Sequence, residues 1–354
     1  MLNVPVQRLH NQYLLHSKID TPGELIARLV VVQGQDYAGG KWGMGLRLPK
    51  STDVEIEQAI ADKKIVRTWA LRGTLHFVNG ADLRWLLALI APRIIAHNAS
   101  MYRKLELDER TLARSNAALA RALRGGKQLN RTQLLASLEK SGISTKGLRA
   151  VHMLQRASLD ALICQTVTVR GNPTYIALDQ LKTRERKMDR SQALADLATR
   201  YFASRSPATL QDFVWWSGLS PADARVGLES IQSHLIQKSL GGQTHWLSHT
   251  VRTRSTRSPT AYFLPPYDEY LFSYKDRSDS IEARHVRKMT AGNGFLSTVM
   301  VDGKVVGTWK RTFQKGAAII ETNLFDPPTP ATHRVLTVAA ERYGQFLGMP
   351  VVLR

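Results

Sequence analysis

Acidic side chains and cysteine are scarce in this sequence. Of its 354 residues, 29 are Asp or Glu and 49 are Lys or Arg, so the formal net charge is +20. The single cysteine, Cys164, excludes an internal disulfide and any cysteine cluster for a metal. The apolar content of 43% is ordinary and excludes a disordered polycation. A folded chain this basic favours a polyanionic partner, which is DNA, RNA or an anionic membrane surface.

Long apolar runs are also lacking. The most apolar run, residues 85–96, is interrupted by Pro92 and Arg93, and a membrane-spanning helix needs about 20 apolar residues. The first residues lack the basic and then apolar layout of a signal peptide. We therefore expect a monomeric cytoplasmic protein with no membrane partner. Its length fits one large or two to three small folding units.

Two short patterns resemble ligand sites but are incomplete. The Gly-Gly-Lys triplet at 125–127 lacks the upstream glycine of a phosphate-binding loop. His245 and His249 lie four residues apart, but they fall in a predicted hairpin with no third ligand nearby. Cys164 falls at the end of an apolar predicted helix, where we expect it to pack. We expect neither a cofactor nor a metal.

Three segments repeat the order helix, turn, helix, strand pair, which is typical of a winged helix. Their helices are predicted at 22–32 and 54–61, at 134–140 and 146–163, and at 191–203, 210–216 and 222–234, and their strand pairs at 65–78, 166–178 and 236–247. Two further helices, at 82–95 and 101–124, extend the first unit. The last part alternates as strands at 295–301, 304–311 and 317–323, followed by a helix at 334–348.

The predicted fold class is therefore α+β, with tandem winged-helix units and a C-terminal β-rich subdomain. An exposed basic linker is predicted at 252–257. The expected domains are a first winged-helix unit with its helical extension at 1–125, a second unit at 126–185, a third at 186–257 and the β-rich subdomain at 258–354.

A pair of glutamines, Gln33 and Gln35, follows an apolar run whose spacing predicts a helix that ends at the pair. Burying a glutamine amide is costly unless its hydrogen-bonding groups are used. The two amides offer donors and acceptors but no titrating group. Two interpretations stay open at this point. The amides either bridge backbone groups at a helix end, or they position a water molecule and stabilise a developing charge.

The segment 72–76, Arg-Gly-Thr-Leu-His, is predicted to be a strand that places Thr74 and His76 on one face. It belongs to the same small unit as the glutamines, so this face is expected to look toward them. The alternative is an ordinary edge strand with a hydrogen-bonded histidine.

Basic residues alternate with tryptophan near the glutamines and recur in the predicted hairpins. This pattern fits phosphate contacts with an aromatic ring near an extruded base, and it equally fits core tryptophans with solvated basic neighbours. The candidate DNA contacts along the chain are Trp42, Arg47, Arg67, Arg72, Arg149, Arg170, Lys310 and Arg311.

Four segments spread over nearly the whole chain carry a resemblance to a known family. They are Gln33-Gly34-Gln35-Asp36, Arg72-Gly73-Thr74-Leu75-His76, Leu264-Pro265-Pro266-Tyr267-Asp268-Glu269-Tyr270 and Val301-Asp302-Gly303-Lys304-Val305-Val306-Gly307-Thr308-Trp309. In these residues and their order the sequence resembles the AlkZ and YcaQ family of bacterial DNA glycosylases. The family's Gln-x-Gln motif maps to Gln33 and Gln35, as in the AlkZ branch, since the YcaQ branch has Asp at the second position. Gly34 departs from the family pattern, which has a small or aliphatic side chain there.

The resemblance implies tandem winged helices bent into a C around duplex DNA. It implies hydrolysis of the bond between an alkylated purine and its sugar, in which Gln33 and Gln35 act through their amide dipoles. Thr74, His76 and Asp36 are expected to support them. An N7- or N3-alkylated purine already carries positive charge, so cationic lesions are the expected substrates. Some members of the family also remove interstrand crosslinks. The lack of an evident Schiff-base lysine fits a monofunctional enzyme.

Two other functions fit part of the sequence. A non-enzymatic winged-helix protein, such as a transcriptional regulator, explains the helices and the charge, because that fold more often only binds. A binder of structured RNA explains the charge but leaves the glutamine pair without a role.

Overall fold

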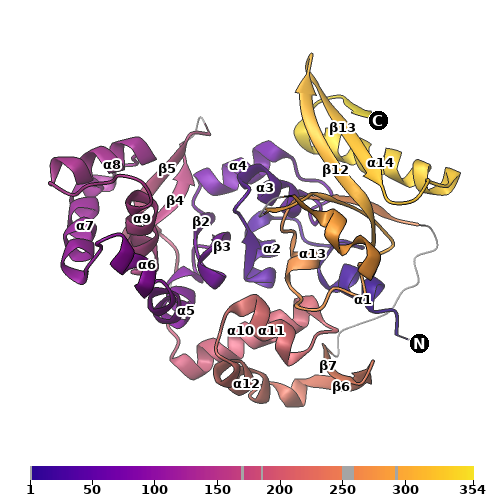
Figure 1. Cartoon of the computed structure of the whole chain (residues 1–354), viewed down its shortest axis with the longest axis horizontal. Coiled ribbons are helices and arrows are strands. Elements are labelled where there is room, and N and C mark those ends of the chain that lie inside the picture. The colour runs from indigo at the N-terminus through magenta and orange to yellow at the C-terminus, as the bar shows by residue number, and fades with distance from the viewer. Residues whose placement is uncertain (1, 169–170, 185, 249–258, 292–293) are drawn as a thin grey trace.

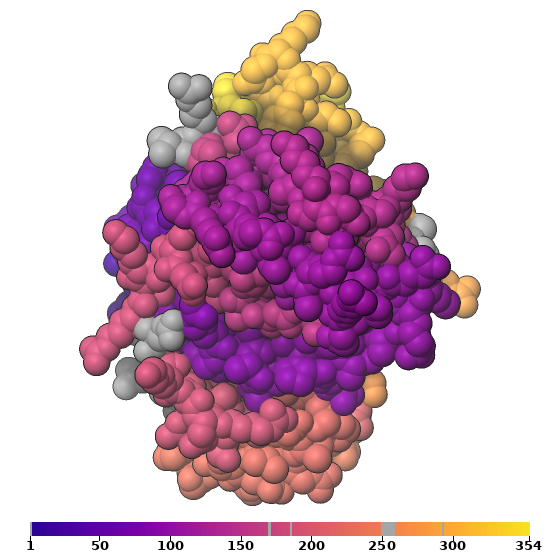
Figure 2. Space-filling view, turned by 90° about the vertical axis from the view of Figure 1, so that its left-hand side faces the viewer, coloured from indigo at the N-terminus to yellow at the C-terminus, as the bar shows by residue number. Residues whose placement is uncertain are grey.

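The structure, a computed structural model, describes residues 2–168, 171–184, 186–248, 259–291 and 294–354. Figure 1 shows a central group that contains α2, α3, β2 and β3, with other groups around it. One contains α6 to α9 with β4 and β5, one contains α10 to α12 with β6 and β7, and one contains β12, β13 and α14. Viewed from the side, α7 to α9 lie in the middle of the surface, between the C-terminal elements and α10 to β7 (Figure 2).

The strand pairs of the first two predicted units join into one sheet. Its strands are β1 (Val31–Gln33), β2 (Ile65–Trp69), β3 (Leu75–Asn79), β4 (Ile163–Val167) and β5 (Pro173–Ala177). They lie in the order β1-β3-β2-β4-β5, and β2 meets β4 at Arg67 and Gln165. The first two predicted domains therefore share a continuous sheet, and the domain boundaries themselves stay a prediction.

The helices of the first half are α1 (Val4–Asn11), α2 (Pro22–Leu29), α3 (Tyr37–Gly45), α4 (Asp53–Ala61), α5 (Leu83–His97), α6 (Ala99–Lys104), α7 (Glu109–Ala122), α8 (Arg131–Lys140) and α9 (Arg149–Leu159), with 3-10 turns η1 (Leu71–Gly73) and η2 (Arg124–Gly126). Of these, α1, α2, α4, α7 and α8 begin at a residue whose side chain accepts an N–H of the first turn. The Thr21 hydroxyl accepts the Glu24 N–H at 3.2 Å and starts α2, as predicted. Thr52 forms a capping box at α4, and Asn130 forms one at α8.

Three predicted helices end earlier than their apolar spacing indicated. The helix predicted at 22–32 ends at Leu29, because Val30 takes a φ of 69° and the chain continues as β1. The helix predicted at 101–124 divides at Glu106, which has a φ of 51°. The helix predicted at 146–163 ends at Leu159, so Cys164 lies buried on β4 and not at a helix end.

The third predicted unit has its elements in the expected order. It contains α10 (Arg190–Arg205), α11 (Leu210–Ser217), α12 (Pro221–Glu229), η4 (Gln232–His234), β6 (Leu235–Leu240) and β7 (Gln243–Ser248), and it follows the 3-10 turn η3 (Leu178–Gln180) that ends the second unit. The hairpin turns at Gly241 and Gly242, whose positive φ values of 55° and 74° suit glycine. The helix predicted at 222–234 ends at Glu229. The order fits a winged helix, and that assignment stays a prediction.

The C-terminal part is β-rich, as predicted. It contains β8 (Ala261–Leu264), α13 (Glu269–Phe272), η5 (Ala283–Met289), β9 (Thr290–Ala291), β10 (Gly294–Phe295), β11 (Thr298–Val301), β12 (Lys304–Gln314), β13 (Ala317–Leu324), α14 (Pro330–Leu347) and β14 (Val351–Leu353). Five of the strands form a sheet in the order β14-β13-β12-β11-β8. The fold is thus α+β. None of the helices in the described ranges is long and apolar enough to cross a membrane.

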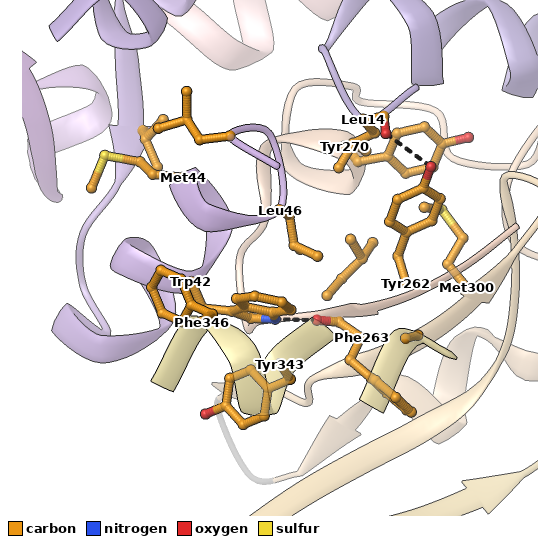
Figure 3. Packing of buried hydrophobic residues seen from close by; sticks show 14 of the residues in the cluster. Leu14, Trp42, Met44, Leu46, Tyr262, Phe263, Tyr270, Met300, Tyr343 and Phe346 are labelled. Carbon is orange, nitrogen blue, oxygen red and sulfur yellow. Dashed lines mark hydrogen bonds between the residues drawn. The ribbon is translucent and has the colours of Figure 1, made fainter. Parts of the chain in front are cut away.

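One hydrophobic core joins the two ends of the chain. Trp42 of α3 packs edge-on against Tyr343 and beside Phe346 of α14 (Figure 3). Its indole N–H donates to the Phe263 carbonyl oxygen at 2.6 Å. Glycine allows this approach, since a Cβ at Gly45 would overlap the Phe346 ring. The core therefore holds α3, which directly follows the glutamine pair, against the C-terminal subdomain.

Candidate active site

The side chain of Gln33 is fully engaged with its own neighbourhood. Its amide oxygen accepts the backbone N–H groups of Gly34 and Gln35 at 2.8 and 2.9 Å. Its amide nitrogen donates to the Thr74 hydroxyl at 3.3 Å. The bridging interpretation thus describes Gln33, except that the residue ends a short strand and not a helix. Gln33 shapes the turn that presents Gln35.

Gln35 is the exposed member of the pair. Its amide oxygen accepts the Leu75 backbone N–H at 3.3 Å, which anchors the side chain to the strand opposite. Gly34 between the glutamines is also fixed, because its N–H donates to the Leu75 carbonyl oxygen and its own carbonyl accepts from Arg67, both at 2.8 Å. The turn is therefore rigid although it contains glycine, and it holds one amide at the surface.

His76 faces Gln33 across the β1–β3 ladder, since the two residues are directly paired and opposite residues share a face. Its Nδ1 lies 2.9 Å from the Thr74 carbonyl oxygen. Only 1% of His76 is exposed, so its ring has no open surface for direct contact with DNA. Burial, the largest cause, and the charge of Arg72 lower the pKa of His76 to about 4. The imidazole is neutral at physiological pH.

A buried carboxylate that the sequence analysis did not select lies directly behind the motif. Glu269 accepts the backbone N–H of Gln33 on one oxygen at 3.1 Å. Its other oxygen accepts from Arg205 at 2.8 Å, and from the Trp216 indole and the Ser273 hydroxyl, both at 3.0 Å. Burial alone would raise the pKa of Glu269, but the charge and hydrogen bond of Arg205 hold it below its ordinary value. Glu269 is an ionised anchor for Gln33.

A signal for Glu269 was present in the sequence. Asp268 and Glu269 form an acidic pair within an otherwise apolar and aromatic stretch, and such a pair is rarely buried unless each charge has a partner. The partners Arg47 and Arg205 lie far away in the chain, so sequence spacing did not reveal them.

The other titrating side chains near the motif are turned to neighbouring elements. Asp36 begins α3, and a Cβ at Gly39 would overlap its carboxylate, so the side chain lies against that helix. Lys41 is 7% exposed and forms ion pairs with Asp53 at 2.8 Å and Glu57 at 2.7 Å. A lysine held in two ion pairs is not free to act as a nucleophile.

Two predicted DNA contacts are corrected by the structure. Arg47 is fully buried and forms a two-pronged pair with Asp268 at 2.8 and 2.9 Å. Trp42 is 1% exposed in the core described above. Neither side chain reaches a surface where a phosphate or a base can lie. The alternative interpretation, core tryptophans with solvated basic neighbours, describes Trp42, whereas neither interpretation predicted the buried ion pair of Arg47.

Three arginines that were predicted to contact DNA are partly exposed, but each donates hydrogen bonds to other groups of the protein. Arg67 donates to the Gly34 carbonyl and, at 2.6 Å, to the Gln165 amide oxygen, which binds the turn to β4. Arg72 donates to the carbonyl oxygens of Trp215 and Trp216 at the end of α11. Arg149 donates to the carbonyls of residues 105, 106 and 144. All three stabilise the scaffold, and their DNA contacts stay a prediction.

The remaining predicted contacts that the structure describes, Lys310 and Arg311, lie in the C-terminal part. Lys310 is exposed and pairs with Glu321 at 2.8 Å, and Arg311 lies 5.8 Å from the centre of the Tyr343 ring. Both belong to the long β12–β13 hairpin. Arg170, together with His249 and the linker at 252–257, lies outside the described residues.

A surface pocket of about 430 Å³ borders the turn η1, which precedes β3. Arg72 and Gly73 form one side of it, and Arg93, Ile94, Gln155 and Gly218 are among the residues around it. Its basic lining suits an anion better than a cation.

Comparisons with known proteins agree with this arrangement. The model of the family "DNA glycosylase AlkZ-like" matches residues 26–346. The chain is 24% identical, over 95% of its length and 92% of the relative's, to the interstrand DNA cross-link repair glycosylase of Streptomyces sahachiroi. The solved structure of the S. sahachiroi DNA glycosylase AlkZ superposes with a TM-score of 0.81 at 19% identity and covers 99% of this chain and 98% of that one.

The family match covers most of the chain and includes the glutamine pair and the segments at 72–76 and 264–270. The segment at 72–76 was predicted as a strand, but Arg72 and Gly73 belong to the 3-10 turn η1 and have positive φ values, and β3 begins only at Leu75. An enzyme that hydrolyses N-glycosyl bonds therefore replaces the alternatives of a regulator and an RNA binder. The resemblance seen in the sequence is confirmed: the chain belongs to the AlkZ-like family of DNA glycosylases.

Proposed function

We propose that this enzyme is a monofunctional glycosylase that releases purines made cationic by alkylation at N7 or N3, from single lesions and from interstrand crosslinks in duplex DNA. The observation that supports this proposal most directly is the exposed amide of Gln35 on a rigid turn, while the carboxylate of the next residue, Asp36, lies against α3. An amide stabilises charge and orients water through its dipole. It does not exchange a proton at neutral pH.

Leaving-group chemistry supports cationic substrates. A neutral base needs a proton before it departs, and a general acid must carry that proton near neutral pH. His76, the imidazole paired with Gln33, has a pKa of about 4 because it is buried, so it does not supply one. Glu269 is ionised and bound to Arg205. The alkylated purine already carries the charge, and the enzyme is left to stabilise the sugar and deliver water.

Hydrolysis without a covalent intermediate is supported by Lys41, the lysine nearest the motif in the chain. Its ammonium group is committed to Asp53 and Glu57. A Schiff base needs a deprotonated amine that reaches the sugar. The reaction proposed here therefore ends at an abasic site with an intact strand.

Interstrand crosslinks are proposed as substrates because of their chemistry and because of the name of the relative. A crosslink formed by bifunctional alkylation at N7 of two purines carries the same positive charge at each end. The S. sahachiroi relative is named an interstrand cross-link repair glycosylase. A pair of glutamines that needs only a charged leaving group suits both kinds of lesion.

The test uses a duplex with one N7-methylguanine and a matched duplex with uracil. Wild-type protein should release N7-methylguanine and leave an alkali-labile abasic site, and it should leave uracil in place. Gln35→Ala should abolish release, while binding to undamaged duplex changes less than about twofold, because the amide carries no charge for phosphate. Efficient uracil release, or strand cleavage without alkali, would refute the proposed chemistry.

A further inference from the structure

A tryptophan pair on α11 presents one ring inward and one ring outward. Trp216 is 1% exposed and donates its indole N–H to Glu269 at 3.0 Å. Trp215 is 41% exposed, because successive residues of a helix point about 100° apart. The outward indole thus lies one residue from the network that anchors Gln33. The reaction proposed above gives this indole no role.

Two arginines lie beside the exposed ring. The guanidinium carbons of Arg72 and Arg277 are 5.8 and 5.7 Å from the centre of the Trp215 ring. Arg277 also lies 4.9 Å from the centre of the Phe272 ring, and its Nε donates to the Leu271 carbonyl oxygen at 2.8 Å. The rings and the carbonyl hold the guanidinium in one position.

Neither Arg72 nor Arg277 forms an ion pair with a carboxylate in the part of the chain that the structure describes, where their hydrogen bonds go to carbonyl oxygens. Glu269 attracts Arg72, and Asp212 and Asp276 attract Arg277, only from beyond ion-pair distance. The Nη2 atom of Arg277 is buried without a partner among the described residues, so it does not itself reach the surface. The two like charges beside the ring favour an anion there.

The sign of the charge decides which group of the substrate lies here. A cationic lesion base is repelled by two guanidinium groups, whereas a phosphate is attracted to them. The Trp215 face suits a neutral unstacked base, and such stacking is sequence-tolerant. The cationic lesion base therefore lies at Gln35, and the phosphate of the neighbouring nucleotide lies at Arg277.

We propose that Trp215, Arg72 and Arg277 form a site for the nucleotide next to the lesion, whose neutral base stacks on Trp215 while its phosphate contacts Arg277. The site adjoins the motif, because Arg72 lies two residues before Thr74, which accepts from Gln33 at 3.3 Å. This proposal rests on the duplex substrate of the proposed function. It assigns Trp215 and Arg277 to positioning the substrate.

The experiment places 2-aminopurine, a fluorescent base, beside an N7-methylguanine and, in a second duplex, beside an ordinary guanine. Trp215→Ala should reduce the fluorescence change on binding the lesion duplex and lower the affinity roughly 5- to 150-fold, the range for loss of one base–aromatic stack. Trp215→Phe should restore most of both. The matched control is Val226→Ala, which removes an apolar side chain that is 49% exposed on the next helix.

The phosphate contact has its own test. Arg277→Gln should weaken binding and reduce the slope of log affinity against log salt by about one, whereas Arg277→Lys should keep the slope. Arg110→Gln, an exposed arginine on α7, controls for the loss of one charge from the whole protein. Circular dichroism melting verifies that each variant is folded.

The outcomes separate this proposal from the proposed function. Equal fluorescence changes for Trp215→Ala and Val226→Ala would overturn the stacking site even if wild-type protein releases N7-methylguanine. A Trp215-dependent fluorescence change in a protein that releases no base would support the site and refute the proposed function. An effect of Arg110→Gln as large as that of Arg277→Gln would overturn the phosphate contact.

Discussion

Replacing Glu269 tests whether its buried hydrogen bonds and its ion pair with Arg205 hold the turn that carries Gln33 and Gln35. Glu269 is 3% exposed and Arg205 is 0% exposed, so removal of the carboxylate leaves a buried arginine without its partner, at a cost of about 3–5 kcal/mol. Glu269→Ala also leaves the Gln33 N–H without an acceptor, which adds about 1–3 kcal/mol. The free energy of unfolding of a domain is usually about 5–15 kcal/mol, so these losses are large.

Glu269→Gln removes the negative charge of the side chain but keeps its size and shape. An amide has one accepting end, but the carboxylate accepts on both oxygens, from Gln33 on one side and from Arg205, Trp216 and Ser273 on the other. Whichever way the amide turns, its NH2 group faces a donor. We therefore expect Glu269→Gln to lose about 3–5 kcal/mol as well, and single-turnover release of N7-methylguanine to fall even where the protein stays folded.

The assay is urea unfolding at pH 7, followed by circular dichroism, with base release measured at low urea. Glu24→Gln is the matched control, because Glu24 and Arg28 form an exposed pair at 2.8 Å and such pairs contribute about 0–1 kcal/mol. A double-mutant cycle with Arg205→Met should return a coupling above about 1 kcal/mol. Unfolding and base release of Glu269→Gln equal to wild type would refute the idea that this network positions Gln33.

Four further predictions concern charge and protons. Duplex binding should be largely independent of sequence and fall by roughly 10³-fold between 50 and 200 mM salt if about six phosphates are contacted, and a filter-binding titration that stays flat would contradict this. Because the folded pKa of His76, about 4, lies below its unfolded value of about 6.5, the unfolded chain binds more protons between these values. The free energy of unfolding should therefore fall by about 3 kcal/mol as the pH drops from 6.5 to 4, and His76→Asn should flatten this dependence in urea titrations. Asp36→Asn should keep most base release, since the carboxylate lies against α3, and a loss as complete as that of Gln35→Ala would make Asp36 the base. The release rate itself should be nearly constant from pH 6 to 9, because neither amide of the motif titrates.

The sequence was most informative where structure is local. Caps such as Thr21 and the Gly241-Gly242 turn fixed element boundaries, because they act through neighbours a few residues away. The order of elements in the third unit and the C-terminal strands followed from alternation and turn residues. The α+β class was therefore predictable without any long-range contact.

Long-range contacts explain the errors. The strand Val31–Gln33 is three residues long and exists because it pairs with β3, whereas its own spacing continued the pattern of a helix. Arg47 pairs with a residue 221 positions away, so a basic residue near tryptophan looked like a phosphate contact. Composition alone does not distinguish a buried charge with a distant partner from an exposed one.

The candidate site shows the same division. The structure places the two members of the glutamine pair differently, and the chemical role of Gln35 stays a proposal. Gln33 bridges backbone groups and Gln35 is presented at the surface. Local sequence showed two amides, but only the pairing of β1 with β3 determines which one points into the strand and which one is exposed.

The distribution of the resemblance along the chain has a physical explanation in this site. The segments at 33–36, 72–76 and 264–270 meet through the bonds of Gln33 to Thr74 and Glu269. The fourth segment, at 301–309, supports the third, since the Tyr270 hydroxyl donates to the Gly303 carbonyl at 3.0 Å and the Trp309 indole to the Leu264 carbonyl at 2.8 Å. Segments that share hydrogen bonds constrain one another's side chains. Motifs far apart in sequence are therefore one unit in space, and a change in any of them is expected to act on the position of Gln35.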